Sequence, residues 1–356
     1  MVHNWMFYYF SQPDLQADHT RAESTQAVYD RYLDLCVRDE RLGFEGVFFS
    51  EHHFSPLNLS PSPNLMVAAA AQLTKTLRLG VMGNVLPLHD PRRLAEECGM
   101  LDYITRGRLE IGLGPGVGGE PVKAGLDPEE IRPRYASGAE VIGKYLRNHR
   151  VTHDDDFTKL DDVPIIPAMR QSAPSVWVTA MSESSAAWAA TSGFKVCTAW
   201  LPTDQVADLC RTYHVAADEA GVGTQAAGFG IRRRVFVAPT DTEALELAEA
   251  AFDPVALAIQ GGASGPAQAT ALEASDSHVM KMFMNPDDII IGSPETVTER
   301  LVEQVRTIGA DHVMYFSDFK MFDPADLVRC HELIGERVAP VLRSTTVDAP
   351  TTATVG

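Results

Sequence analysis

Cysteine is scarce and scattered in this sequence, which argues against two kinds of stabilising site. The 356 residues include five cysteines, an odd number without a C-x-x-C pair, so neither a disulfide framework nor a zinc site is predicted. No stretch approaches the roughly 20 apolar residues of a membrane helix, and the N-terminus lacks the basic segment of a signal peptide. We therefore expect a cytoplasmic protein whose thiols are packed as small core side chains.

Basic residues are also few. The chain has 30 Lys and Arg against 48 Asp and Glu, which gives a net charge of −18. Binding to nucleic acid or to an anionic membrane depends on clustered Lys and Arg. The densest basic run, Arg232–Arg234, lies within a strand-like segment and is too short for such a patch. Neither nucleic acid nor a membrane is expected as a partner.

What the sequence does contain is a regular alternation of short apolar runs with longer helix-period runs. Eight runs have the length and composition of strands: Trp5–Phe10, Gly46–Ser50, Leu77–Leu86, Arg108–Leu113, Val176–Met181, Lys195–Trp200, Gly228–Ala238 and His312–Phe316. A helical pattern follows each one, which predicts a single (β/α)8 barrel over residues 1–343. A flexible tail is expected at 344–356. Insertions are expected after the fourth and seventh strand–helix units, at 151–173 and 260–291.

Catalytic groups of such a barrel lie at the carboxyl ends of its strands, where the second strand runs into Glu51-His52-His53. An imidazole can accept and donate a proton near neutral pH, so a histidine here is a candidate acid or base. Neighbouring residues of an extended segment point to opposite faces, so one of the two is expected to enter the site. Loop packing and metal binding stay open as alternatives for this pair.

Three further segments have two interpretations each. Gly112–Gly119 contains the spacing G-x-G-x-x-G, but Pro115 interrupts it, so it is either a loop that approaches a flat or phosphorylated ligand or a plain turn. Ser182–Ser185 opens a helix, where hydroxyls and free N–H groups bind an anion or only cap the helix. Asn64–Leu73 is apolar or small on nearly every face, which predicts a subunit interface or a helix under a loop.

Five segments at successive strand ends resemble a known family: Glu51–Phe54, Gly80–Pro87, Gly107–Gly112, Val178–Ser182 and Ile291–Glu295. From about Trp5 to Leu342 the chain resembles the bacterial luciferase-like flavin monooxygenases, particularly the luciferase alpha subunit. The resemblance implies an enzyme that takes reduced FMN from a separate flavin reductase, forms a flavin C4a-hydroperoxide with O2 and oxygenates a small organic substrate. The two insertions would form a lid that keeps water out, and a homodimer is expected.

The resemblance also implies roles for individual residues. His52 matches the catalytic histidine of the family, and Met82-Gly83 matches a non-prolyl cis peptide beneath the flavin. Ser182 and Ser185 match positions that hold the FMN phosphate. The full set implied for cofactor binding is Met82, Gly83, Asn84, Gly114, Val117, Ala180, Met181, Ser182, Ser185 and Trp200; no metal ligand is implied.

Three positions depart from luciferase. Pro115 stands in place of a phosphate-binding arginine, Gly114 in place of a reactive cysteine and Met181 in place of a glutamate. These differences predict weaker flavin retention, a different substrate and no light emission. Arg170 is the candidate for a replacement arginine.

Other functions remain open at this stage. One is an F420-dependent oxidoreductase on the same barrel, and another is a non-catalytic luciferase-like subunit. A third is a metal-dependent barrel hydrolase that uses His52 and His53.

Overall fold

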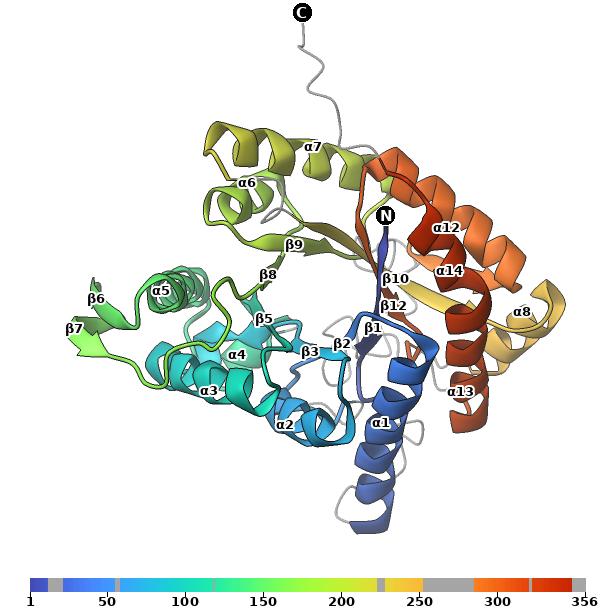
Figure 1. Cartoon of the computed structure of the whole chain (residues 1–356), viewed down its shortest axis with the longest axis horizontal. Coiled ribbons are helices and arrows are strands. Elements are labelled where there is room, and N and C mark those ends of the chain that lie inside the picture. The colour runs from blue at the N-terminus through green and yellow to red at the C-terminus, as the bar shows by residue number, and fades with distance from the viewer. Residues whose placement is uncertain are drawn as a thin grey trace, which may run out of the picture.

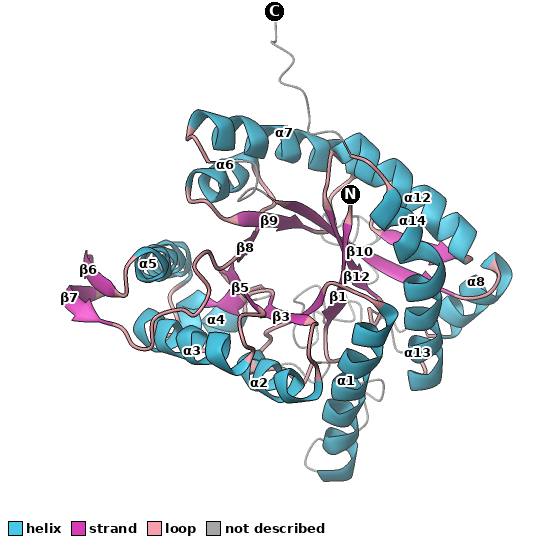
Figure 2. Ribbon diagram, viewed as in Figure 1, coloured by secondary structure: helices cyan, strands magenta, loops and turns pink. Residues whose placement is uncertain are grey.

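The computed structural model describes residues 1–11, 22–54, 58–117, 119–222, 228–251, 285–319 and 322–347. Within these ranges eight parallel strands close into a barrel in the order β1, β2, β3, β5, β8, β9, β10 and β12, and β12 pairs with β1. The strands form an inner ring and the helices cover it from outside (Figures 1 and 2). The predicted (β/α)8 barrel is confirmed.

The strands begin and end close to the predicted positions. The barrel strands are β1 (His3–Tyr8), β2 (Gly46–Phe49), β3 (Arg78–Val81), β5 (Leu109–Gly114), β8 (Val176–Thr179), β9 (Lys195–Thr198), β10 (Phe229–Val237) and β12 (His312–Phe316). The segment predicted as one strand at Leu77–Leu86 is divided, because β3 is followed by the short β4 (Asn84–Val85) and a 3₁₀ turn at Leu86–Leu88. One more parallel strand, β11 (Ile289–Gly292), pairs with the end of β10.

Helices follow the strands and cover the barrel. They are α1 (Ala22–Leu42), α2 (Pro63–Leu73), α3 (Pro91–Ile104), α4 (Glu120–Lys123), α5 (Pro128–Arg147), α6 (Glu183–Thr191), α7 (Thr203–Glu219), α8 (Asp241–Ala250), α12 (Pro294–Ile308), α13 (Pro324–Leu333) and α14 (Ala339–Ser344). A π-helical turn at Ile334–Val338 joins the last two. None of the helices in the described ranges is long and apolar enough to cross a membrane.

Side-chain caps fix where several helices start. The carboxylate of Asp90 accepts a hydrogen bond from the backbone N–H of Arg92 at the start of α3, and Asp127 caps α5 in the same way. Pro follows each cap at the first helical position, where its missing N–H costs nothing. These local signals explain why the predicted starts of α3 and α5 agree with the structure.

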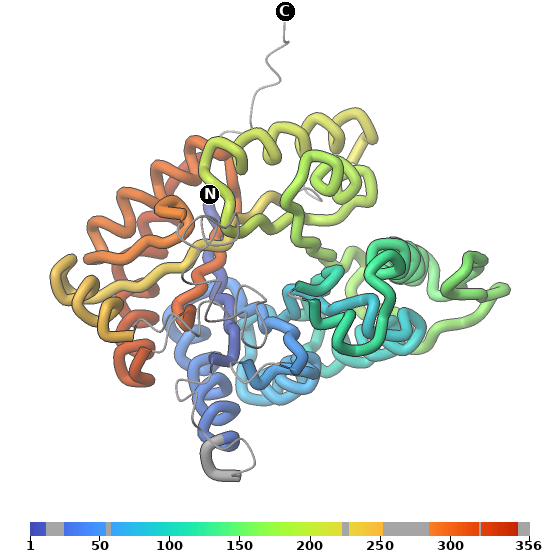
Figure 3. Tube along the Cα trace, turned by 180° about the vertical axis from the view of Figure 1, so that it is seen from behind, coloured from blue at the N-terminus to red at the C-terminus, as the bar shows by residue number. Residues whose placement is uncertain are grey.

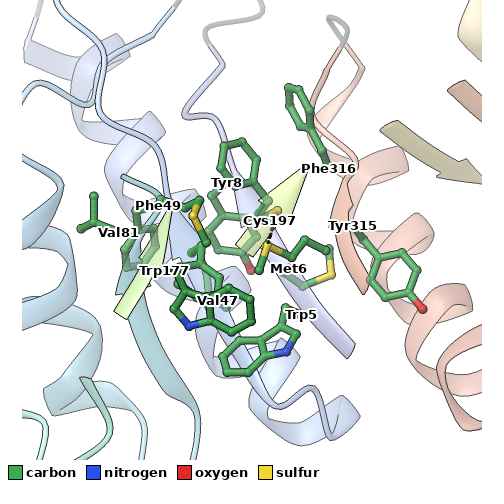
Figure 4. Close-up of a cluster of buried hydrophobic side chains, with 14 of the residues drawn as sticks. Trp5, Met6, Tyr8, Val47, Phe49, Val81, Trp177, Cys197, Tyr315 and Phe316 are labelled. Carbon is green, nitrogen blue, oxygen red and sulfur yellow. Dashed lines mark hydrogen bonds between the residues drawn. The ribbon is translucent and has the colours of Figure 1, made fainter. Parts of the chain in front are cut away.

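The amino-terminal end of the barrel is filled by large side chains (Figure 4). Trp5 and Trp177 lie edge to face with ring centroids 6.1 Å apart. The indole of Trp5 donates to Nδ1 of His312 at 3.0 Å, and that of Trp177 donates to Glu110 at 2.6 Å. Because these residues occupy the beginnings of the strands, the barrel is closed at this end and a ligand can enter only from the other.

The expected insertions have different outcomes. Residues 150–164 form an antiparallel hairpin of β6 (Arg150–Asp154) and β7 (Lys159–Pro164). The hairpin packs on α5, where His153 contacts Ser137, and it projects away from the barrel (Figures 1 and 3). It contributes no residue to the pocket described below, so the expectation of a lid at 151–173 is wrong. Residues 252–284, most of the second expected insertion, lie outside the described residues, as does most of the expected tail.

Candidate active site

A cavity of about 370 Å³ opens at the carboxyl ends of the barrel strands. Most of the residues predicted for the site line it, although they come from five strands and their following loops. These are His52, Met82, Gly83, Gly114, Val117, Met181, Ser182, Ser185 and Trp200. The fold therefore brings the predicted residues to one place.

Asn84 and Ala180 lie behind the wall of the cavity and do not line it. The side-chain amide of Asn84 donates to the carbonyl of Gly112 at 2.9 Å and accepts from Asn64. Ala180 is fully buried. Both side chains support the lining residues from outside.

His52 is held by a carboxylate that the sequence analysis did not identify. Nδ1 of His52 lies 2.9 Å from Oε1 of Glu120, which begins the short helix α4. A carboxylate at this distance accepts a hydrogen bond from Nδ1–H, which keeps that proton on Nδ1 and leaves Nε2 to accept or carry a second proton. The ring of Tyr9 packs on His52 at 4.8 Å. Burial, followed by the nearby Glu120 carboxylate, raises the pKa of Tyr9, which keeps this phenol neutral.

The side chain of His53 points away from that of His52, as expected for neighbouring residues of an extended segment. Its Nε2 lies 2.9 Å from Glu51, whose carboxylate also accepts from His89 at 2.9 Å and from the backbone N–H of Val85. Burial alone would raise the pKa of Glu51, but the bonds from His53 and His89 lower it below 4.5. His53 is thus a packing and hydrogen-bonding residue beside the site.

One wall of the cavity is formed by backbone. The Met82–Gly83 peptide bond is cis, as the resemblance implies. A Cβ atom on Gly83 would lie 2.7 Å from the carbonyl carbon of Leu113, so these two chain segments touch. A Cβ atom on Gly114 would have no neighbour closer than 3.9 Å, and Gly114 lines the cavity. Its missing side chain leaves space that a flat ligand can occupy.

The end of the cavity nearest α6 is polar. Ser182 and Ser185 form a capping box: the Ser182 hydroxyl accepts from the backbone N–H of Ser185, and the Ser185 hydroxyl accepts from that of Ser182. Arg132, on α5, lines the same cavity. Tyr135 of α5 and Trp188 of α6 pack together with ring centroids 5.8 Å apart. Arg132 lies three residues before Tyr135, and Ser185 lies three residues before Trp188. Ser182, Ser185 and Arg132 all line the cavity, and we refer to them as its anion-attracting end.

The opposite wall contains two arginines of the run Arg232–Arg234, which the sequence analysis placed within a strand. Arg232 and Arg234 point into the cavity from β10, and Arg233 points outward to Gln304. Alternation along the strand produces this arrangement. Arg234 is paired with Asp288 at 2.5 Å. The Arg232 guanidinium lies among aromatic rings.

Arg170 is not the replacement arginine. It bonds the carbonyl of Arg106 beside Gly107, before the start of β5 and so at the closed end of the barrel. Arg132, in contrast, lines the cavity. Among the residues described, no three His, Cys, Asp or Glu side chains are grouped as metal ligands.

Curated relatives resemble this chain to different extents. The chain is 26% identical over 359 residues to 3,6-diketocamphane 1,6-monooxygenase of Pseudomonas putida, covering 89% of this chain and 94% of the relative. It is 31% identical to the alkanal monooxygenase alpha chain of Aliivibrio fischeri, over 52% of each protein. It is 30% identical to the oxygenase component of a flavin-dependent trigonelline monooxygenase from Acinetobacter baylyi, over 49% of each. The match to the last two thus spans about half of each relative.

Solved structures share the fold. A monooxygenase from Streptomyces bottropensis, RslO1, superposes with a TM-score of 0.79 at 22% identity, over 95% of this chain and 99% of that one. The coenzyme F420-dependent tetrahydromethanopterin reductase of Methanopyrus kandleri has a TM-score of 0.71 at 19% identity, over 95% of this chain and 99% of that one. At these identities the likeness shows the fold alone.

The sequence also matches a family profile, that of the luciferase-like monooxygenases, over residues 6–312. This range contains every predicted site residue and nearly all of the barrel. The chain is an enzyme that belongs to the luciferase-like monooxygenase family.

Proposed function

We propose that the protein is the oxygenase component of a two-component monooxygenase that uses reduced FMN from a separate flavin reductase. The observation that carries this proposal is the combination, in one cavity, of a backbone wall at Met82–Gly83, the open space at Gly114 and an anion-attracting end at Ser182 and Ser185. A flat ring that carries a phosphate fits these features. When bound, reduced FMN supplies the electrons that activate O2, so that one oxygen atom enters a small organic substrate.

The phosphate end is assigned to Ser182, Ser185 and Arg132. Hydroxyls and free backbone N–H groups at the start of α6 donate hydrogen bonds to an anion, and Arg132 adds a positive charge. This charge comes from α5, whereas luciferase places its arginine where Pro115 stands.

The proton chemistry is assigned to His52. Oε1 of Glu120 accepts a hydrogen bond from Nδ1 of His52 at 2.9 Å, which orients the ring and leaves Nε2 available for proton transfer. Nε2 can then hold or move a proton during oxygen transfer. Glu120 is a positioning residue, since it acts through His52.

Water is kept away from the reacting groups by apolar side chains. Phe7, Phe316, Met82 and Trp200 line the cavity between its two polar ends. A dry cavity strengthens the hydrogen bonds inside it and protects reactive species from water. This environment favours oxygen transfer over release of hydrogen peroxide.

We further propose that the protein works as a cytoplasmic homodimer. All five cysteines are buried and unpaired, which suits a reducing compartment. Leu65 and Leu73 of α2 and Met100 and Tyr103 of α3 are each more than half exposed, and the two helices are neighbours (Figure 1). Exposed apolar side chains on two neighbouring helices mark a surface that another copy can cover.

A second candidate function is hydride transfer with the deazaflavin F420. An F420-dependent reductase shares the fold, and the proline at position 115 leaves this candidate open. Anaerobic titration with reduced FMN and with reduced F420, followed by fluorescence, separates the two candidates. We expect saturable binding of reduced FMN and weaker or no binding of F420. The reverse order of affinities would replace the proposal with the second candidate.

A further inference from the structure

The guanidinium of Arg232 is held in the cavity without a polar partner. Its side chain reaches into the cavity from the middle of β10. Its Nη2 is inaccessible to solvent and has no hydrogen-bond partner among the described residues. Burial lowers the pKa of this guanidinium, as expected for a cation kept out of water. Arg232 as a whole is half-buried, but an inaccessible N–H group without an acceptor is costly, and an anion in the cavity would pair with it.

Aromatic rings surround the guanidinium of Arg232. The Cζ atom of Arg232 lies 4.6 Å from the ring centre of Phe7, 4.7 Å from that of Trp200 and 5.3 Å from that of Phe316. Ring faces attract the cation, but they do not accept the in-plane hydrogen bonds of its N–H groups. The N–H donors of the Arg232 guanidinium, Nη2 among them, therefore remain available to an acceptor in the cavity.

The carboxylates near Arg232 already have other hydrogen-bond partners. Asp288 pairs with Arg234 and accepts from the backbone N–H of Trp200. Glu51, the one carboxylate among the described lining residues, is on the other side of β1 and β12 and accepts from histidines. Glu120 bonds His52. None of these groups bonds Arg232.

The strand order places Arg232 away from the proposed flavin wall. β10 lies four strands from β3 in either direction around the barrel, so the two are opposite. Met82–Gly83 follows β3, and the anion-attracting end with Arg132 lies near β5 and β8. A flat ring against the β3 wall leaves the β10 side for the second ligand.

We propose, on the basis of the proposed function, that Arg232 binds a carboxylate of the organic substrate, and that this substrate is a small apolar acid. A carboxylate matches the fork of the guanidinium in charge and geometry. The rings of Phe7, Trp200 and Phe316 contact the apolar part of the same molecule.

Benzoate and its neutral analogue benzamide test this inference. Both are titrated by calorimetry into the wild-type protein, with and without FMN. We expect benzoate to bind at least about tenfold more tightly than benzamide. Arg232→Met should abolish this preference and leave FMN affinity within about threefold, and Arg232→Lys should keep part of it. Arg132→Ala and the exposed surface variant Arg211→Met should retain it in full.

The outcomes are distinct. Equal binding of the two probes by the wild type, or a preference that survives in Arg232→Met, would overturn the inference. Loss of FMN binding in Arg232→Met would assign Arg232 to the cofactor, which overturns the inference and leaves the proposed function intact. If the wild type binds no FMN, the proposed function fails, and the comparison of probes in the FMN-free protein still decides the role of Arg232.

Discussion

At the scale of the residue, the contact between His52 and Glu120 orients the imidazole in the site. Of two adjacent histidines, one is turned into the cavity and oriented by a carboxylate, and the other is turned to Glu51. The sequence predicts that the two diverge, because side chains alternate along an extended segment. It does not identify Glu120, which follows a glycine-rich loop 68 residues away.

His52→Ala is expected to lower the rate of substrate oxygenation by about 10²–10⁴, the usual contribution of a positioned acid or base. The rate is measured with reduced FMN supplied in excess, so that cofactor binding does not limit it. His53→Ala is the matched control and should stay close to wild type. Wild-type turnover by His52→Ala would remove this residue from the mechanism.

Arg132→Ala is expected to weaken FMN binding by about tenfold, since it removes a charge-assisted contact to the phosphate. Riboflavin, which lacks the phosphate, should bind the variant and the wild type equally. Arg147→Ala, at the other end of the same helix, serves as the control. An equal loss of affinity for riboflavin would show that Arg132 does not act on the phosphate.

At the scale of the element, Glu51 ties the end of β2 to the segment before α3. It does so through His89 and the backbone N–H of Val85. Burial would lower the pKa of His89, but the bond to Glu51 raises it above 6.5. The lowered pKa of Glu51 adds stability above pH 4.5 that is lost as the pH falls. The raised pKa of His89 adds stability below pH 6.5 that is lost as the pH rises.

Glu51→Gln should therefore be most destabilising between about pH 4.5 and 6.5, by about 1.5–3 kcal/mol. Urea unfolding of the variant and the wild type across this range measures the difference in the free energy of unfolding. The difference should shrink on both sides of the window. A difference independent of pH would mean that the charged pair does not contribute.

Gly83, just after β3, and Gly114, at the end of β5, differ in the space around them: a side chain at Gly83 would meet backbone, and one at Gly114 would enter the cavity. Gly114→Leu should fill the cavity and weaken FMN binding by about tenfold or more without changing thermal stability, because its Cβ meets open space. Gly83→Ala should destabilise the protein by about 1–3 kcal/mol, because its Cβ would lie 2.7 Å from the Leu113 backbone. Flavin titration and thermal melts of both variants check this. Tight FMN binding by Gly114→Leu would place the ligand elsewhere.

At the scale of the whole molecule, the exposed apolar face of α2 and α3 predicts the oligomeric state. We expect a dimer by light scattering, and a monomer after the double substitution Leu65→Glu and Met100→Glu, since charge on this face opposes its burial. Leu245→Glu, at an exposed leucine of α8, should leave the dimer intact. A monomeric wild type at micromolar concentration would contradict the proposed interface.

Local signals determined how much of the architecture could be predicted. Strand runs and the caps at Asp90 and Asp127 are short-range features, so the barrel and the starts of α3 and α5 could be read from sequence. The hairpin at 150–164 lacks such a signal: its strands are short and largely polar, and only its packing on α5 defines it.

The site could be predicted in part for the same reason. Residues just after strands, such as His52 and Ser182, meet at the barrel mouth whenever the barrel closes. Arg132 comes from a helix. Arg232 comes from inside a strand, and whether its side chain faces the cavity depends on the register of that strand. Their places in the cavity depend on tertiary packing, for which a single sequence gives no pattern.

The central claim is that the cavity at the barrel mouth holds reduced FMN and directs its reaction with O2. Rapid mixing of the anaerobic complex of protein and reduced FMN with oxygenated buffer tests this most directly. We predict a long-lived absorbance distinct from those of reduced and oxidised FMN, which decays faster in His52→Ala. Reoxidation at the rate of free reduced FMN, with immediate hydrogen peroxide and no such absorbance, would contradict the account.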